Sequence, residues 1–159
     1  MAVAGIRADI RGMKQLQRKL QALGSPARQR KAMRPGITKA SRLIAKAAKK
    51  YVPKGEGLTP GGEKRTHLRT AISQNVKTYA SGNVVGVIGP RRVKDTKAFH
   101  GPIIEKGTDE RSTKKGTSRG RGPAFNFLAK AIDTAGPSAR AVLSREIKAQ
   151  IEKLAMQTK

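Results

Sequence analysis

Two stretches in the first third of the chain repeat their apolar residues at helical spacing. The first predicts a helix over residues 13–23, because its apolar residues lie three or four positions apart and Gly24-Ser25-Pro26 follows as a stop signal. The second predicts a helix over about 27–51, which Val52-Pro53 ends because proline lacks a backbone N–H. An interruption at Pro35-Gly36 remains open. The apolar stripe of this second helix consists of Ile37, Ala40, Ile44, Ala47, Ala48 and Tyr51.

Three other stretches have the alternation or the β-branched composition of strands. Residues 3–10 alternate, with Ile6, Ala8 and Ile10 on one face. Residues 68–79 alternate as well, and the β-branched stretch 84–88 follows turn-forming residues, so these two predict a β-hairpin. The order of elements predicts an α+β fold, in which a small antiparallel β-sheet (the N-terminal strand plus the hairpin) packs against two to four helices.

The last third of the chain predicts further helices separated by glycine and proline. A short apolar element over 99–106 is closed by Gly107, which suits a backbone site with positive φ. Residues 124–134 predict a helix that Pro123 starts, and Gly136-Pro137 separates it from a last helix over about 138–156 with Ser138 as its N-cap. Residues 54–66 and 109–122 predict exposed loops that order on docking, within a single domain of residues 1–159.

Composition adds a strong charge and a thin apolar interior. The chain has 35 Lys and Arg against 10 Asp and Glu, for a formal net charge of +25. Leu, Ile, Val and Phe make up 31 of its 159 residues, which predicts a small core. The absence of cysteine excludes a disulfide scaffold, Cys-ligated zinc and a thiol nucleophile. No run approaches the ~20 apolar residues of a membrane span and residues 1–14 lack a signal-peptide core, so we expect a soluble protein of intracellular origin.

The basic residues concentrate near the N-terminus. All 14 Lys and Arg between Ile10 and Gly55 lack an acidic neighbour in that stretch, which favours a polyanionic partner. The basic side of the second helix is the best candidate surface, and the sequence leaves open whether it faces DNA or an acidic protein. The five aromatic residues form no stacking platform for single strands. The candidate contacts are Arg28, Arg30, Lys31, Arg34, Lys39, Arg42, Lys46, Lys49 and Lys50.

The sequence disfavours an enzyme. Neither His67 nor His100 has a second histidine, or an acid at ligand spacing, with which to build a metal site. The glycine-rich stretches at 55–57 and 116–122 match neither a phosphate loop nor a dinucleotide fingerprint. We therefore predict no catalytic residue, no metal and no cofactor.

Four blocks stand in a fixed order along the chain. They are Gly12-Met13-Lys14-Gln15-Leu16 with Leu20 and Leu23; AAKKYVP at 47–53 followed by HLRTAI at 67–72; VVGVIG at 84–89; and FHGPIIEKGT at 99–108 followed by RGPAFNFL at 121–128. The resemblance that they carry covers roughly residues 6–135. In this order the blocks resemble a family of tailed-bacteriophage proteins that join the head to the tail, variously called neck, tail-completion or minor tail protein Z-like proteins.

The resemblance implies a structural virion protein of the neck or tail, made in the host bacterial cytoplasm. It implies a homo-oligomeric ring of sixfold or related symmetry, with connector (head-completion) proteins and tail-terminator or tail-tube proteins as partners and non-specific contact with packaged DNA. The alternative is a basic host-type nucleic-acid-binding protein, which explains the charge but leaves the Glu-x-Gly-Thr block and the hairpin without a role. The signature residues, as interface or fold candidates, are Phe99, Glu105, Gly107, Thr108, Pro123, Phe125 and Leu128.

Two roles are expected within this signature. Among so many bases, Glu105 is expected to form an ion pair with an Arg or Lys, within or between subunits. Phe125, Phe127 and Leu128 suit core packing, and the competing interpretation is that one of them anchors a subunit interface.

Overall fold

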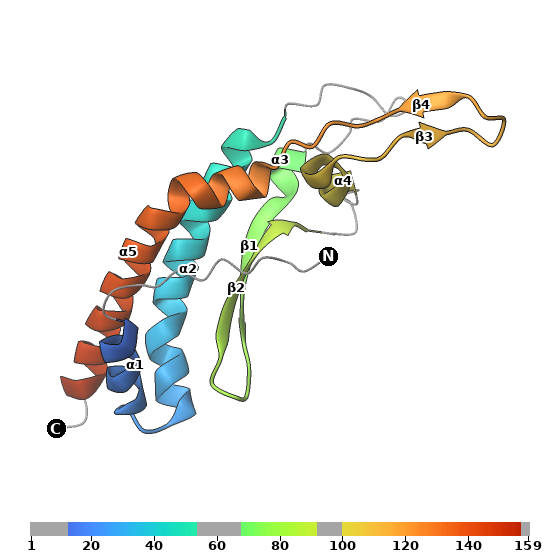
Figure 1. Cartoon of the computed structure of the whole chain (residues 1–159). Coiled ribbons are helices and arrows are strands. Elements are labelled where there is room, and N and C mark those ends of the chain that lie inside the picture. The colour runs from blue at the N-terminus through green and yellow to red at the C-terminus, as the bar shows by residue number, and fades with distance from the viewer. Residues whose placement is uncertain (1–12, 54–67, 92–99, 157–159) are drawn as a thin grey trace.

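The computed structural model describes residues 13–53, 68–91 and 100–156, and the fold is α+β (Figure 1). The helices are α1 (Met13–Gln21), α2 (Pro26–Tyr51), α3 (Leu68–Ala71), α4 (Gly101–Lys106) and α5 (Phe127–Met156). The strands are β1 (Ile72–Thr78), β2 (Val84–Pro90), β3 (Arg111–Ser112) and β4 (Ser118–Gly120). They pair as two antiparallel two-stranded sheets, β1–β2 and β3–β4. The predicted strand at 3–10 and the predicted loop at 54–66 lie outside the described residues.

Helices α2 and α5 run antiparallel and side by side along the length of the molecule (Figure 1). Towards one end, the Tyr51 hydroxyl and Thr134 Oγ1 share a hydrogen bond of 2.9 Å. Towards the other end, the buried Gly36 brings the two helices close together, because a Cβ there would lie 3.2 Å from both the Leu143 carbonyl oxygen and Ile147 Cγ1. A larger residue at position 36 would therefore push the two helices apart.

The predicted β1–β2 hairpin is confirmed, and it packs on α2. Its register pairs Ile72 with Pro90 at the open end and Thr78 with Val84 next to the turn. Gly86 of β2 lies directly against α2, so closely that a Cβ on it would overlap Ser41 Oγ. The hairpin thereby covers a second side of α2, one that its apolar stripe did not predict.

The burial of α2 reflects these two partners. Ala40 and Ala48 are buried, as the apolar stripe predicts, whereas Tyr51 at its end is 38% exposed. Ser41 and Ala45, which lie outside the stripe, are buried as well. A helix packed on two sides needs small residues on both, and this explains the alanine content of the segment.

Residues 68–71, predicted as the start of a strand, instead form the helical turn α3. Leu68 and Ala71 stand three positions apart and are both buried. Residues at this spacing share one side of a helix, whereas in a strand they point to opposite faces. Burial of both side chains therefore favours the helical turn, and β1 begins immediately after it at the fully buried Ile72.

Two prolines lie inside helices, one at a position where the sequence left an interruption open and one where it predicted a break. α2 is continuous through Pro35, so the interruption left open there does not occur. α5 is continuous through Pro137, so residues 124–134 and 138–156 are not separate helices and Ser138 is not an N-cap. An interior proline costs about 3 kcal/mol, and the long α2–α5 contact offsets that cost. α5 bends along its length instead of ending (Figure 1), as expected of a helix that contains proline.

Two apolar clusters hold these elements together, and alanine contributes to both. Phe127 and Ile72 are the largest fully buried side chains of the described residues, which fits the small core that the composition predicts. The first cluster joins α2, α3, β1 and α5 and contains Ala48, Val52, Leu68, Ala71, Ile72, Phe127 and Ala131. The second joins α1, α2 and α5 and contains Leu16, Ala32, Ile147, Ile151 and Leu154.

Residues 109–122, predicted as a loop, contain a second hairpin, β3–β4. Thr113 closes its turn, because its N–H donates to the Thr117 carbonyl at 2.8 Å and its Oγ1 accepts from the Thr117 N–H at 3.1 Å. Gly116 supplies the positive φ of +82° that this turn requires. In Figure 1 the hairpin extends away from the α2–α5 pair as an arm, and we call residues 109–121 the arm. No helix in the described part of the chain has the length and apolar character that crossing a bilayer requires.

Candidate functional site

The signature residues around Glu105 meet where α4 ends and α5 begins. The Glu105 carboxylate accepts hydrogen bonds from the backbone N–H of Leu128, at 3.0 and 3.2 Å, and from that of Ala129, at 3.4 Å. These N–H groups belong to the first turn of α5, where no helical partner is available to them. Glu105 thus caps a helix that starts 22 positions later in the chain, and its negative charge complements the positive end of the helix dipole.

This arrangement corrects the expected role of Glu105. An ion pair with an Arg or Lys, within or between subunits, was predicted; the pair within the subunit is not formed in the described part of the chain, where the carboxylate meets only backbone N–H groups. The backbone completes the same connection, since the Phe125 N–H donates to the Ile104 carbonyl and the Asn126 N–H to the Glu105 carbonyl, both at 3.0 Å. We call this set of contacts between residues 104–108 and 122–129 the junction.

Gly107 and Thr108 close the base of the arm at the same place. The Thr108 N–H donates to the Gly122 carbonyl at 3.0 Å, and Thr108 Oγ1 accepts from the Gly122 N–H at 2.9 Å. Gly107 has the predicted positive φ, with φ of 73° and ψ of −171°. A Cβ on Gly107 would lie 2.6 Å from the Gly122 carbonyl oxygen. Only glycine fits this close approach of two backbone segments.

The remaining signature residues lie around the junction in different environments. Phe127 is fully buried in the first cluster and Leu128 packs against that cluster, as the core-packing interpretation predicts. Phe125 is 36% exposed and so stays a candidate for an interface. Pro123 does not start α5, because the helix begins four residues later, after Asn126 with its positive φ of 49°. Phe99 lies outside the described residues.

Removing the cap is expected to destabilise the junction. A Glu105→Ala variant should lose about 1–2 kcal/mol of unfolding free energy, since loss of an N-cap costs roughly this much. Glu105→Gln keeps an acceptor oxygen without the charge and should lose less. Urea unfolding followed by circular dichroism measures both. No loss in Glu105→Gln would show that the charge contributes nothing and that the cap acts by hydrogen bonding alone, whereas an equal loss in the two variants would show that a neutral acceptor cannot replace the carboxylate.

The predicted basic side of α2 is present and largely exposed. Of its nine candidate residues, seven are exposed and two, Arg30 and Lys49, are partly buried. Five of the nine recur at helical spacing along one side of the helix. That side extends about 30 Å, from the rise of 1.5 Å per residue in a helix. The five are Arg28, Lys31, Arg42, Lys46 and Lys49.

Two of the other basic residues are held by neighbouring elements. Lys39 Nζ forms an ion pair with Glu146 Oε1 of α5 at 2.7 Å. Arg30 Nη1 donates to the carbonyl oxygens of Tyr79 and Ala80 at 3.2 and 3.1 Å, next to the turn of the β1–β2 hairpin. The nine candidates therefore do not form one uniform surface, because part of their charge is used to hold α5 and the hairpin against α2.

Arg30 and its neighbours also line a cleft. A cavity of about 380 Å³ opens between the N-terminal half of α2 and the end of β1. Three cationic side chains border it, and none of the three pairs with a carboxylate in the part of the chain that the structure describes. The lining residues are Arg30, Lys31, Arg34, Pro35 and Thr78. We call this feature the basic cleft.

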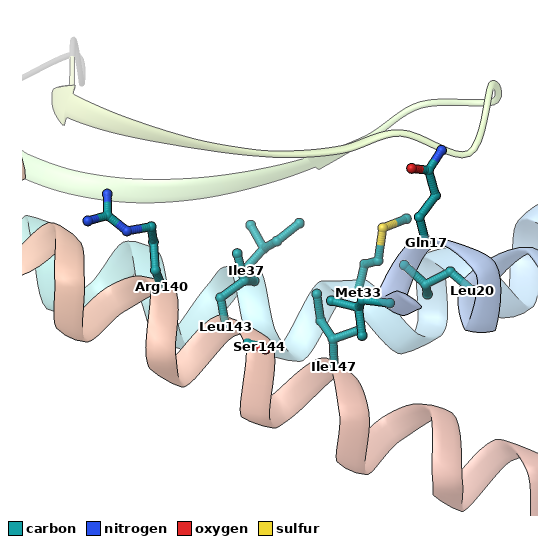
Figure 2. Close-up of a pocket in the computed structure, with 9 residues that line it drawn as sticks. Gln17, Leu20, Met33, Ile37, Arg140, Leu143, Ser144 and Ile147 are labelled. Atoms are coloured by element: carbon teal, nitrogen blue, oxygen red, sulfur yellow. The ribbon is translucent and has the colours of Figure 1, made fainter. Parts of the chain in front are cut away.

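A second cavity is apolar. It has a volume of about 310 Å³ and lies between α1, α2 and α5, beside the second cluster. Figure 2 shows Met33 and Ile37 of α2 and Leu143 of α5 at its centre, with Gln17 and Arg140 at opposite ends. Arg140 is the one charged side chain among the described residues that line it. The cavity therefore offers shape and apolar contact and no reactive group.

Sequence reasoning did not identify several of these contacts. No linear pattern predicts that the carbonyl oxygens of Tyr79 and Ala80, or Thr78 in the basic cleft, contact α2. The β1–β2 hairpin brings these groups next to α2 only in the folded chain. Among the described residues, no three His, Asp, Glu or Cys side chains gather as they do at a metal site. Comparisons of the chain with protein-family models, curated proteins and solved structures find no match. The motif residues and their geometry therefore carry the functional argument.

Proposed function

We propose that this chain is a structural protein of a tailed-bacteriophage virion, which joins the head to the tail or completes the head-proximal end of the tail. The junction is the observation that carries the proposal. Two signature blocks that lie more than ten residues apart in the sequence form one structural unit, in which Glu105 caps α5 and Thr108 pairs with Gly122. The signature residues of the junction thus hold the base of the arm against the start of α5.

The arm is the part of the described structure best suited to contact another molecule. It extends from the junction, and its two strands pair with each other while packing little against the helices or the β1–β2 hairpin (Figure 1). It contains no large apolar residue that would hold it against the body of its own subunit. A projecting element that docks on the next copy gives a heterologous contact, and such contacts close into rings.

Under this proposal the protein acts by assembly. Copies form a ring of sixfold or related symmetry in the neck or at the tail end, between connector (head-completion) proteins and tail-terminator or tail-tube proteins. The basic side of α2 then meets packaged DNA or an acidic neighbouring ring, because +25 charges on each copy favour a polyanionic surface.

Particles assembled without the chain test this function. In the phage that encodes it, loss of the gene product should leave heads and tails unjoined in negative-stain images, and adding the purified chain should join them. A variant whose residues 112–118 are replaced by Gly-Gly should fail to join them, because the arm is shortened while the junction is kept. Lys114→Gln/Lys115→Gln, which keeps the arm length, serves as the control and should still join them. Joined, infectious particles in the absence of the chain would contradict the proposal.

The second candidate function is that of a basic host-type nucleic-acid-binding protein, which the row of bases on α2 favours. A salt titration separates the two candidates. Binding through phosphates weakens steeply between about 50 and 200 mM salt. A neck protein should still enter symmetric particles with connector or tail proteins at the higher concentration, whereas a protein that only binds nucleic acid should not.

A further inference from the structure

The basic cleft combines charge, concavity and a fixed side chain in one place. Arg30 is held by two carbonyl oxygens of the hairpin end, at 3.2 and 3.1 Å, through a single nitrogen, Nη1. Its other guanidinium N–H groups, which the fork geometry of arginine fixes in direction, are left for a ligand in the cleft. The hairpin therefore orients one cation before any ligand arrives.

Lys31 and Arg34 complete the site. Arg34 lies one helical turn beyond Arg30, on the same side of α2, because residues four apart are neighbours on a helix. Lys31 and Arg34 are both exposed, and Thr78 of β1 closes the opposite wall. No acidic residue occurs in α2, so nothing on that helix neutralises these charges. The site is an anion-binding arrangement of three cations and one hydroxyl group.

We infer that the basic cleft is a phosphate-binding site that takes backbone phosphates of double-stranded DNA. Arginine, lysine and threonine are the side chains that contact phosphate oxygens in protein–DNA complexes, and arginine binds phosphate with two parallel hydrogen bonds. This inference rests on the proposed function, and it names which part of the basic side of α2 meets the packaged DNA.

The composition of the cleft favours DNA over an acidic protein. Interfaces between proteins are centred on aromatic anchors, whereas none of the described residues that line this cleft is aromatic and three of them are cations. Beyond the cleft, Arg42, Lys46 and Lys49 continue along the exposed side of α2. The whole row covers about 30 Å, close to one turn of duplex DNA, so the cleft and the row can follow one stretch of backbone.

Salt-dependent binding of the full chain to a fluorescein-labelled 20-base-pair duplex tests the site by anisotropy. The test variant is Lys31→Gln/Arg34→Gln, which leaves Arg30 and the hairpin contact in place. The matched control is Arg145→Gln/Lys148→Gln on α5, since this pair has the same residue types and the same spacing and is likewise exposed. Thermal unfolding of the three proteins verifies that each is folded.

The slope of log K against log salt distinguishes the outcomes. Each phosphate contact adds about 0.9 to the magnitude of this negative slope, so K31Q/R34Q should reduce the magnitude by about 1.8. Between 50 and 200 mM salt the full chain should then lose about tenfold more affinity than K31Q/R34Q. R145Q/K148Q should keep the slope of the full chain. An equal decrease in both variants, or none in K31Q/R34Q, overturns the inference and shows a diffuse electrostatic attraction.

Polyglutamate serves as a second test ligand, because it carries carboxylates in place of phosphates. If K31Q/R34Q weakens binding of polyglutamate as much as binding of the duplex, the cleft takes acidic protein and the DNA inference is wrong. The neck function itself is judged separately, by whether heads and tails stay unjoined when the chain is absent and join when the full chain is added. A variant that loses the DNA slope and still joins them supports the site and leaves the proposed function in place.

Discussion

A Phe127→Ala variant is expected to lose about 3–5 kcal/mol of unfolding free energy, the usual cost of truncating a buried phenylalanine. Phe127 has no exposed surface and lies in the first apolar cluster, where α2, α3, β1 and α5 meet. The other fully buried large side chain in the described residues is Ile72, so the cluster has little else with which to fill the cavity. Such a loss is a large fraction of the 5–15 kcal/mol that stabilises a typical domain.

Phe125→Ala is the matched control, since Phe125 has the same side chain two positions earlier and is 36% exposed. Its truncation should cost clearly less stability. Urea unfolding followed by circular dichroism measures both variants. A loss in Phe127→Ala as small as the one expected of Phe125→Ala would show that Phe127 does not hold the four elements together. A loss of head–tail joining in a stable Phe125→Ala variant would instead mark Phe125 as a subunit contact.

The second large effect is expected from Gly107→Ala, which should cost about 3 kcal/mol or more, since its backbone conformation is one that glycine alone adopts readily. The added Cβ would lie 2.6 Å from the Gly122 carbonyl oxygen and 2.9 Å from the Ala124 nitrogen. Both are backbone atoms, so no flexible side chain can move aside. The two backbone segments at the base of the arm would have to separate, and the Thr108–Gly122 hydrogen bonds would break.

Gly116→Ala controls for the backbone conformation alone. Gly116 also has a positive φ, of +82°, but a Cβ there meets nothing within 4 Å. Its substitution should cost only about 1–2 kcal/mol, the penalty of a left-handed conformation for an L-residue. If Gly107→Ala and Gly116→Ala unfold at the same urea concentration, the close approach at the base of the arm does not contribute. Both variants are measured in the full chain.

Local patterns predicted most of the elements because the forces that form them are local. The spacing of Leu16 and Leu20 predicted α1, and the β-branched residues around the turn at 80–83 predicted the β1–β2 hairpin. The positive φ of Gly107 was also predictable, since it follows from a glycine that closes an apolar element. The arm was missed although its signal was local, because the turn of Thr113 and Gly116 lies among charged residues that suggested a loop.

The prolines show where local reasoning fails. Pro137 carries a strong breaking signal, and residues 136–138 taken alone favour a helix boundary. α5 continues through Pro137 because α2 packs along it on both sides of that position, from Thr134 opposite Tyr51 to Ile147 opposite Gly36. A contact between helices that are far apart in sequence thus overrides the preference of a single residue.

The amino-acid sequence by itself determined the fold class, the positions of most helices and strands, the small core and the excess of positive charge, since each depends on composition or on neighbours within a few residues. Only the tertiary structure decided what Glu105 binds, which cations remain unpaired with carboxylates, and where a cleft opens beside Arg30. These features join residues 23 to 107 positions apart. No periodicity along the chain predicts which of its N–H groups, carbonyls and cations form contacts when they lie this far apart in the sequence.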